Sequence, residues 1–444
     1  MPSPTQEFTA RNLAWARRFR RQFGLTPDNG KLPRKKEEWS EFLDALEARV
    51  AADNIGFEGL KSSRISKGGK TRVLVSTRSL DEVLVLRRMN ENIRRAYGIK
   101  SPNKENLLRT LKQALSENVR KSILRVDIRS CFESISRKKV LDALKREGLV
   151  SYQTISLLDA LFKRVDSLTP VVNRKGLPRG LAISATLAEI VLSEVEAQIR
   201  RLPGVYLVIR YVDDMVIVSS DVRSNLKRMV HDVLRQNRLR LNSAKTRSYV
   251  VACNCEPDCK HGHACPCLKS CVCGKQDQEV SYSLEYVGYS LMFDKRNNKD
   301  RSNEVQIRLS PAKVKKIKSR IFLATRDYIK SADIVLYEKR IKYLMSNFVV
   351  ISGDGRRGLS TGLSYTHQAY NLPRQREVVE GGDFAALTDF VRAAIRYASN
   401  AHLHNRAKCL DMARYSFVSA FHSKRRMKLS AEDLTGIRSC WVYA

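Results

Sequence analysis

The sequence predicts an α+β fold in which strands carry a few acidic side chains and a basic, mainly helical region follows. Three observations support this prediction. Tyr206–Val218 (YLVIRYVDDMVIV) contains two apolar runs separated by Asp213 and Asp214, which is typical of a strand hairpin with acids at its tip. Leu181–Arg200 is apolar on most of its surface, as a long buried helix would be. From Pro311 onward the pattern is mostly helical and basic.

The other elements follow from local signals along the chain. Gly68 and Gly69 lie between cationic and β-branched residues, which indicates a hairpin, and Ser-Pro-Asn before Lys104 is a helix start signal. In chain order we expect two basic helices within residues 1–50, a hairpin at Arg64–Val75, helices at Asp81–Ala96 and Lys104–Asn118, a strand at Ile123–Ile128, a turn and helix at Arg129–Glu147, a loop at Gly176–Gly180, a helix at Asp221–Gln236, an extended segment at Leu239–Val251 and strand character at Leu284–Phe293.

The charge of the chain points to a polyanionic partner. There are 81 Lys and Arg against 46 Asp and Glu, a formal net charge of +35 in 444 residues. Such a surface repels itself unless nucleic acid or an anionic membrane covers it. No stretch approaches the ~18 to 20 apolar residues of a membrane-spanning helix, so an integral membrane protein is not expected. The Arg-rich segment Phe8–Phe23 lacks the apolar core of a secretory signal, and we expect an intracellular, cytoplasmic protein.

The acids at the hairpin tip are unusual for their surroundings. Adjacent carboxylates between apolar runs repel each other and resist desolvation, and divalent cations would supply the missing positive charge. Asp127 also ends an apolar strand (RVDIRSCF), so paired strands would bring Asp127, Asp213 and Asp214 together. Three carboxylates at one site suit two-metal phosphoryl transfer with Mg²⁺. The alternative is that Asp213 and Asp214 form a solvated turn.

Five segments, in order, resemble the motifs of reverse transcriptases. Tyr211–Asp214 resembles their Tyr-x-Asp-Asp box, and the region around Asp127 resembles their first catalytic motif. Together with the Gly hairpin, these similarities cover roughly residues 64 to 290. The remaining three similar segments are Gly176–Glu189 (GLPRGLAISATLAE), Leu239–Thr246 (LRLNSAKT) and Glu285–Tyr289 (EYVGY).

The resemblance implies roles for individual residues. Asp127, Asp213 and Asp214, with the backbone carbonyl of Ile128, would hold two catalytic Mg²⁺ ions. Phe132 falls where the family places an aromatic gate that excludes the 2′-hydroxyl, although a packed core Phe is the alternative interpretation. Further roles would be triphosphate binding by Lys70 and Arg72, nucleotide binding by Arg179 and Gly180, protonation of leaving pyrophosphate by Lys245, and a primer grip formed by Tyr286, Val287 and Gly288.

Two positions depart from the family pattern. Arg179 stands where the family usually has Gln, and Ala185 stands where Pro is frequent. A cation at position 179 would contact nucleotide or template differently, so fidelity and dependence on a template are open. Motifs simplified in this way resemble the bacterial reverse transcriptases of antiviral defence and abortive infection, which implies a role in antiphage defence with a noncoding RNA.

A cysteine and histidine cluster interrupts the motif region. Seven of the ten cysteines lie between Cys253 and Cys273, a density that favours metal ligation over disulfides in a chain without a secretion signal. Eight such ligands would satisfy two zinc ions, and nine could hold three if some thiolates bridge. The cluster would be a structural staple or a surface for RNA or a partner. Its candidate ligands are Cys253, Cys255, Cys259, His261, His263, Cys265, Cys267, Cys271 and Cys273.

The resemblance therefore implies a right-hand polymerase with palm and fingers, a zinc-binding insertion and an α-helical thumb. Expected partners are an RNA template or noncoding RNA, a DNA product and deoxynucleoside triphosphates, with a second copy or a partner protein left open. The alternatives are a retron or intron-type reverse transcriptase, a template-independent or protein-primed polymerase, and a non-catalytic RNA-binding scaffold. The expected domains are an N-terminal helical extension at 1–50, fingers and palm at 51–308, the zinc-binding insertion at 252–275, and the thumb or C-terminal domain at 309–444.

Overall fold

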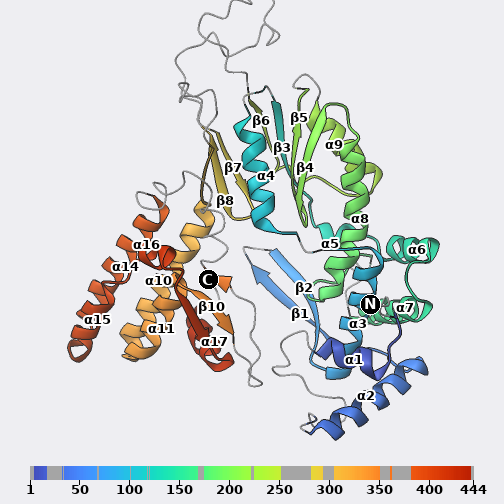
Figure 1. Cartoon of the computed structure of the whole chain (residues 1–444), viewed down its shortest axis with the longest axis horizontal. Helices are drawn as coiled ribbons and strands as arrows, with labels where there is room; N and C mark the ends of the chain where they lie inside the picture. The colour runs from blue at the N-terminus through green and yellow to red at the C-terminus, as the bar shows by residue number, and fades with distance from the viewer. Residues whose placement is uncertain are drawn as a thin grey trace, which may run out of the picture. The chain divides into compact units, whose positions relative to one another are not determined.

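The computed structural model of the chain consists of two compact units. One comprises Met1–Ser101 and Lys121–Val250, and the other comprises Pro102–Arg120 and Val251–Ala444. Both units mix helices and strands, as the sequence predicts (Figure 1). The structure describes residues 5–17, 33, 35–67, 70–100, 102–117, 119, 121–168, 175–221, 225–251, 282–293, 305–350, 361–362 and 382–441.

A four-stranded sheet forms the centre of the first unit. Its strand order is β4-β5-β3-β6, and both β3 and β4 run antiparallel to β5. The described side chains of β3 and β5 are almost all buried, because the two strands occupy the middle of the sheet. The strands are β3 (Lys121–Asp127), β4 (Val205–Tyr211), β5 (Asp214–Ser219) and β6 (Arg247–Val251).

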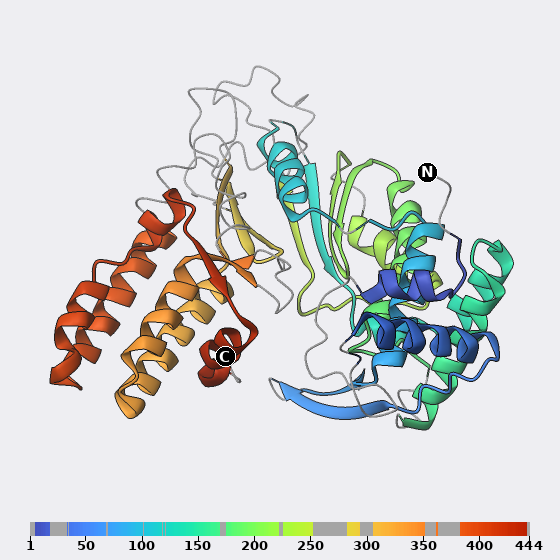
Figure 2. The ribbon, with the colours of Figure 1, turned by 60° about the horizontal axis from the view of Figure 1, so that its bottom comes forward.

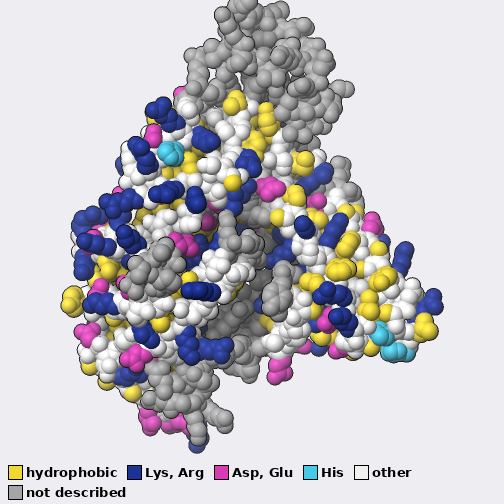
Figure 3. Space-filling model, turned by 180° about the vertical axis from the view of Figure 1, so that it is seen from behind, with side chains coloured by type: hydrophobic (Ala, Val, Ile, Leu, Met, Phe, Trp, Pro, Cys, Tyr) yellow, Lys and Arg dark blue, Asp and Glu magenta, His cyan; other side chains and the backbone are white. Residues whose placement is uncertain are grey.

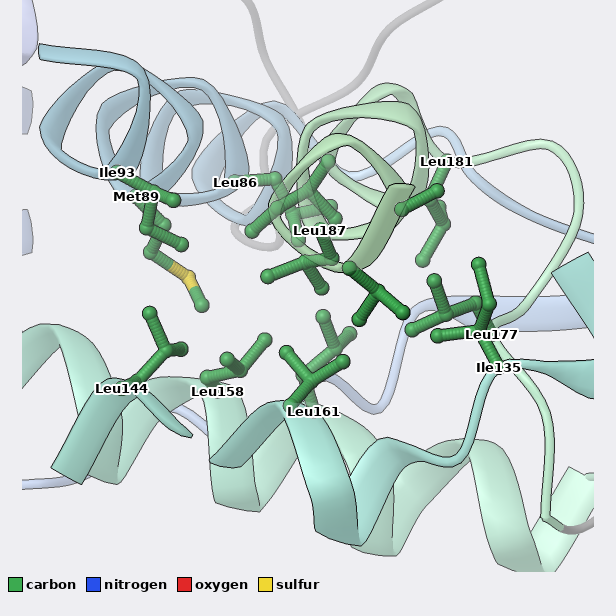
Figure 4. Close-up of a cluster of buried hydrophobic side chains, with 14 of the residues drawn as sticks. Leu86, Met89, Ile93, Ile135, Leu144, Leu158, Leu161, Leu177, Leu181 and Leu187 are labelled. Carbon is green, nitrogen blue, oxygen red and sulfur yellow. The ribbon is translucent and has the colours of Figure 1, made fainter. Parts of the chain in front are cut away.

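Helices cover this sheet and share one apolar core with it. α8 lies against β4, and α9 contacts β3 (Figure 1). Met89 of α3, Leu158 and Leu161 of α7 and Leu187 of α8 point toward one another (Figure 4), in a core that also includes strand side chains. The helices are α1 (Ala10–Arg17), α2 (Lys36–Ala51), α3 (Leu80–Ala96), α5 (Cys131–Ser134), α6 (Arg137–Glu147), α7 (Tyr152–Leu168), α8 (Ala182–Arg200) and α9 (Leu226–Gln236).

The predicted Gly hairpin is confirmed as strands. β1 (Leu60–Lys67) and β2 (Lys70–Thr77) pair antiparallel in register from Leu60↔Thr77 to Lys67↔Lys70. β2 leads into α3, whose N-terminus is capped by Ser79: its side chain accepts a hydrogen bond from the backbone N–H of Glu82.

The second unit contains two three-stranded sheets and a group of packed helices. α10 lies beside α11 and α14, and α14 lies beside α15 (Figure 2). Its sheets have the orders β7-β8-β9 and β11-β10-β12. The elements are α4 (Lys104–Ser116), β7 (Tyr282–Tyr286), β8 (Tyr289–Phe293), β9 (Val305–Leu309), α10 (Pro311–Ser331), α11 (Ile334–Met345), β10 (Asn347–Val350), β11 (Thr361–Gly362), α14 (Asp383–Ser399), η4 (Leu403–Asn405), α15 (Arg406–Met412), α16 (Phe417–His422), β12 (Arg426–Leu429), α17 (Ala431–Arg438) and η5 (Ser439–Trp441).

Two features of this unit go beyond the sequence prediction. Leu284–Phe293 has the predicted strand character, but the chain reverses at Val287 and Gly288, so the segment belongs to the hairpin β7–β8. The C-terminal region is mostly helical, but it also contains the sheet β11-β10-β12, in which β10 and β12 pair in parallel. None of the described helices is long and apolar enough to cross a lipid bilayer.

Candidate active site

The sheet of the first unit brings the three predicted acids together. In the β3–β5 register Asp127 is the direct partner of Asp214, and in the β4–β5 hairpin Tyr211 is the partner of Asp214. The hairpin tip therefore consists of Val212 and Asp213. Directly opposed residues of antiparallel strands have Cβ atoms about 4.5 to 5.5 Å apart, so the carboxylates of Asp127 and Asp214 share one edge of the sheet.

The tip is held in an uncommon backbone conformation. Val212 has a φ of 60°, in the left-handed region that β-branched residues avoid. Residues in such conformations cost about 1 to 3 kcal/mol and persist where the surroundings fix them. Here the backbone N–H of Ile128 donates to the carbonyl of Asp213 at 3.2 Å, which ties the tip to the segment that follows Asp127.

Asp127 is a buried carboxylate with two protein donors. Its Oδ1 accepts from Nδ2 of Asn242 at 2.7 Å, and its Oδ2 accepts from Nζ of Lys245 at 2.9 Å. The backbone N–H of Asn242 also donates to the Asp127 carbonyl at 2.8 Å. The segment LRLNSAKT is therefore joined to the end of β3, and it brings the predicted Lys245 to the acids.

Asp214 forms an ion pair that the sequence did not predict. Nε and Nη2 of Arg125 lie 3.2 and 3.1 Å from its two carboxylate oxygens. Arg125 precedes Asp127 by two residues on β3, so both side chains project from one face, and Arg125 is diagonally opposite Asp214. The available signal was a cation two residues before Asp127, directly after the apolar residues Ile123 and Leu124.

The two acids of the tip resist ionisation. Burial raises the pKa of Asp213, and the neighbouring charge of Asp127 adds to that rise. Burial also raises the pKa of Asp214, although the hydrogen bonds and charge of Arg125 act in the opposite direction. The charged forms of both carboxyl groups are therefore costly to bury, which is the condition that a bound cation would relieve.

The donor set fits a hard divalent cation. Carboxylate oxygens on adjacent strand ends, with a half-buried Asp213 that forms no ion pair with a described Lys or Arg, suit Mg²⁺. In the present arrangement no three His, Cys, Asp or Glu side chains of the described chain are grouped as a metal cage. The reason is that Asp127 and Asp214 point toward Lys245 and Arg125, so ligation by these two would exchange protein cations for metal.

A second ion pair lies over the predicted gate residue. Nε and Nη2 of Arg179 lie 2.5 and 2.9 Å from the carboxylate of Glu133, and the guanidinium lies 5.2 Å from the ring centroid of Phe132. Burial is the largest single influence on the pKa of Glu133 and raises it, but the hydrogen bonds and charge of Arg179, a backbone hydrogen bond and the charge of Arg72 together hold that pKa below its ordinary value. The positive charge of Arg72 on β2 also lowers the pKa of Glu133, so Arg72 acts on the same carboxylate as Arg179.

Two glycines allow the loop around Arg179 to pack closely. Gly180 has a φ of 101°, and a Cβ there would lie 2.4 Å from the carbonyl oxygen of Val75. A Cβ on Gly176 would lie 2.4 Å from the backbone of Glu133. The backbone N–H of Val75 donates to the carbonyl of Arg179 at 2.7 Å, which joins this loop to β2.

Other predicted positions are placed as follows. Ile128 is buried beside the tip, whereas Arg72 is exposed on β2 and Lys70 is the first residue of that strand. In the second unit, Tyr286 is buried, and Val287 and Gly288 form the β7–β8 turn with φ values of 43° and 85°. The predicted zinc ligands from Cys253 to Cys273 lie outside the described residues.

Comparisons with known proteins identify the motif region. The family model described as reverse transcriptase (RNA-dependent DNA polymerase) matches residues 64–291, just over half of the chain. No curated protein sequence matches.

Solved structures with a similar chain path include two telomerases. An apo telomerase from Candida tropicalis, truncated from its C-terminal domain, is 12% identical, with a TM-score of 0.35 over 57% of this chain and 59% of that one. A telomerase from Candida albicans, in complex with a fragment of telomeric RNA, is 14% identical, with a TM-score of 0.40 over 91% of this chain and 66% of that one. The chain thus spans less than two thirds of either relative.

Proposed function

The chain belongs to the reverse transcriptase family, and from this membership we propose that it is an RNA-directed DNA polymerase. It extends a primer by attack of the 3′-hydroxyl on a deoxynucleoside triphosphate. The observation that carries the proposal is the pairing of Asp127 with Asp214 beside Asp213, because a family member that had lost catalysis would have no reason to keep three buried or half-buried acids together.

The acids are proposed to hold two Mg²⁺ ions, with help from the backbone carbonyl of Ile128. Bound there, the ions would lower the pKa of the attacking hydroxyl and neutralise the triphosphate. The strand register supports this, since Asp127 and Asp214 are direct cross-strand partners whose side chains project from the same face of the sheet. Lys245, which contacts Asp127 and is 61% exposed, is proposed to donate a proton to leaving pyrophosphate.

The incoming nucleotide is proposed to lie against Phe132, the gate that excludes a 2′-hydroxyl. Arg179 and Gly180 would line the same place, and Lys70 and Arg72 of the β1–β2 hairpin would contact the triphosphate. Two observations support this arrangement. A backbone hydrogen bond joins β2 to the Arg179 loop, and the charge of Arg72 lowers the pKa of Glu133.

The partners are proposed to be an RNA template, a DNA product and deoxynucleoside triphosphates. The excess of 35 positive charges supports a polyanionic partner, and Figure 3 shows Lys and Arg side chains spread over a whole face and not gathered in one tail. In this proposal residues 51–308 form the fingers and palm, and residues 309–444 form the helical thumb or C-terminal domain. Tyr286, Val287 and Gly288 form the primer grip.

The biological setting follows from the motif resemblance. We propose a bacterial, cytoplasmic enzyme of antiphage defence that acts with a noncoding RNA. Arg179, at a position where the family usually has Gln, supports the assignment to these defence enzymes. We also propose that the cluster from Cys253 to Cys273 binds two or three structural zinc ions. A retron or intron-type enzyme, or template-independent or protein-primed synthesis, would keep the same acids, so sequencing the nucleic acid that copurifies and the product made from it separates these settings.

Primer extension with the purified full-length chain tests the activity. The reaction contains an RNA template, an annealed DNA primer, the four deoxynucleoside triphosphates and Mg²⁺. We expect template-dependent extension that stops when EDTA is added. Binding of the RNA without extension of any primer under these conditions would identify the chain as a non-catalytic scaffold.

A further inference from the structure

The second unit contains a pocket that the proposed polymerase reaction does not use. It has a volume of ≈ 970 Å³ and lies between one face of the sheet β7-β8-β9 and the helices α10 and α14. All of its described lining residues belong to this one unit. Its size is at the upper end of the roughly 300 to 1,000 Å³ typical of small-ligand sites.

The floor of the pocket carries two polar atoms without hydrogen-bond partners among the described residues, although Nη2 of Arg308 donates to Oε1 of Gln306 at 3.4 Å. Ser290 and Arg308 are directly paired across β8 and β9, so their side chains lie on the same face of the sheet. Ser290 is 4% exposed, and neither its Oγ nor Nε of Arg308 has a hydrogen-bond partner among the described residues. Buried polar groups are nearly always satisfied, and two adjacent exceptions beneath a pocket favour a ligand that presents acceptor atoms.

The helical wall supplies positive charge and aromatic surface. Lys315 and Lys318 of α10 line the pocket, and Nζ of Lys318 lies 5.3 Å from the ring centroid of Phe390. Phe322, one turn further along α10, also lines the pocket and is 59% exposed. A large aromatic ring open to solvent inside a cationic recess is unusual for a purely structural position.

One acid, Asp383, is among the described lining residues. Its Oδ2 accepts a hydrogen bond from the backbone N–H of Leu309 at 2.6 Å, at the end of β9. Arg308, Lys315 and Lys318 outnumber this acid and give the recess a positive excess, which complements an anionic ligand.

We infer that this pocket binds a nucleotide unit, with its phosphate on the cations and its base on the exposed ring of Phe322. Cations beside an accessible aromatic ring are the combination that holds single nucleotides, since every base has a face that can stack. The nucleotide is either free in solution or an unpaired nucleotide of a bound strand, and both share this chemistry. A duplex does not fit the inference, because its bases are already stacked.

Binding in the presence of EDTA tests the inference apart from the polymerase reaction, which needs divalent cations. The probes are a nucleoside monophosphate and a short single-stranded oligouridine, measured by fluorescence anisotropy and by ultraviolet cross-linking with peptide mapping on the full-length chain. We expect Phe322→Ala and Lys318→Ala each to weaken probe binding by about tenfold, in the range of base stacking on one aromatic side chain. We also expect cross-links to map to α10.

Two matched variants control for surface effects. Tyr397→Ala removes another exposed ring of the same unit, 71% exposed, and Lys330→Ala removes a cation about 18 Å further along α10. Because Phe322 is exposed, its removal should leave the melting temperature unchanged, and this is measured in parallel. Binding of both probes identifies a free nucleotide as the ligand, and binding of the oligonucleotide alone identifies a strand. Equal binding by Phe322→Ala, Lys318→Ala and the two controls would overturn the inference.

Discussion

Arg179 and Glu133 form a two-point ion pair, with nitrogen to oxygen distances of 2.5 and 2.9 Å. Glu133 directly follows Phe132, and the same guanidinium covers the Phe132 ring at 5.2 Å. Gln, which the family usually has at this position, could neither form the two charged hydrogen bonds nor cover the ring as a cation. The pair therefore fixes the orientation of the proposed gate from two sides.

Replacing Arg179 is expected to loosen sugar selection. In Arg179→Gln the ring of Phe132 loses its cover and Glu133 loses its partner, so the ratio of ribonucleotide to deoxynucleotide incorporation should rise. Phe132→Ala should raise that ratio further, because it removes the ring itself. Competition assays with matched ribo- and deoxynucleoside triphosphates measure this ratio. Arg414→Gln, at an 85% exposed arginine, is the control, and unchanged selectivity in both gate variants would refute the gate role.

Removing one charge from the acidic tip is expected to stabilise the fold. Burial raises the pKa of Asp213 above 3.8 in the folded chain, so the ionised carboxylate opposes folding. The cost is absent below the unfolded pKa, grows as pH rises through the folded pKa and is complete above it. Asp213→Asn should therefore melt at a higher temperature than the wild type at pH 7 in EDTA.

Changes of pH, added Mg²⁺ and a control variant test the same prediction. The gain should shrink as the pH is lowered toward 3.8 and should also shrink when Mg²⁺ is added, since the cation relieves the same repulsion in the wild type. Asp142→Asn, at an exposed acid of α6, should show no gain. A melting temperature equal to or below that of the wild type at pH 7 would contradict the claim that the ionised carboxylate of Asp213 opposes folding.

Substitutions of Lys245 can distinguish a role in proton donation from a role in stability. Its side chain is 61% exposed, so its ion pair with Asp127 contributes at most about 1 kcal/mol to stability. Loss of a proton donor costs about 10² to 10⁴ in rate. Lys245→Met should therefore slow single-nucleotide incorporation strongly while the melting temperature hardly changes. Lys245→Arg keeps the charge but releases no proton near neutral pH, and full rescue by it would exclude the donor role.

The Cys/His segment is expected to bind metal. Its nine ligands predict two or three zinc ions per purified chain, measured by elemental analysis. Cys253→Ser together with Cys255→Ser should lower the zinc content. Cys409→Ser, at a buried free thiol outside the segment, should not. Purified wild-type protein without zinc would refute the prediction.

The sequence predicted those site residues whose charge is unfavourable in the apolar segments that surround them. Asp127, Asp213 and Asp214 end or interrupt apolar strands, where burial alone disfavours a carboxylate, so a metal-binding role could be inferred from the pattern. Arg125 and Asn242 were missed, since a cation within a strand and an amide in an extended segment acquire meaning only when the strand register is known. The ion pair of Arg179 with Glu133 joins residues 46 apart in sequence, beyond any local pattern.

Two features of the fold were missed for related reasons. The β7–β8 turn uses Val287 at a φ of 43°, and Val is not a turn signal, so the strand character of Leu284–Phe293 was predicted but the chain reversal within it was not. The parallel pairing of β10 with β12 joins Asn347 to Arg426 across most of the C-terminal region. When two short strands pair across so many residues, neither has a sequence pattern that indicates its partner.

Single-nucleotide extension by Asp213→Ala/Asp214→Ala tests the central claim most directly. With an RNA template, an annealed primer and Mg²⁺, we predict that incorporation falls to the level seen without protein. RNA affinity should stay close to that of the wild type, because the removed acids do not attract a polyanion. Asp142→Asn should extend normally. Extension at the wild-type rate by the double variant would contradict the assignment of these acids to catalysis.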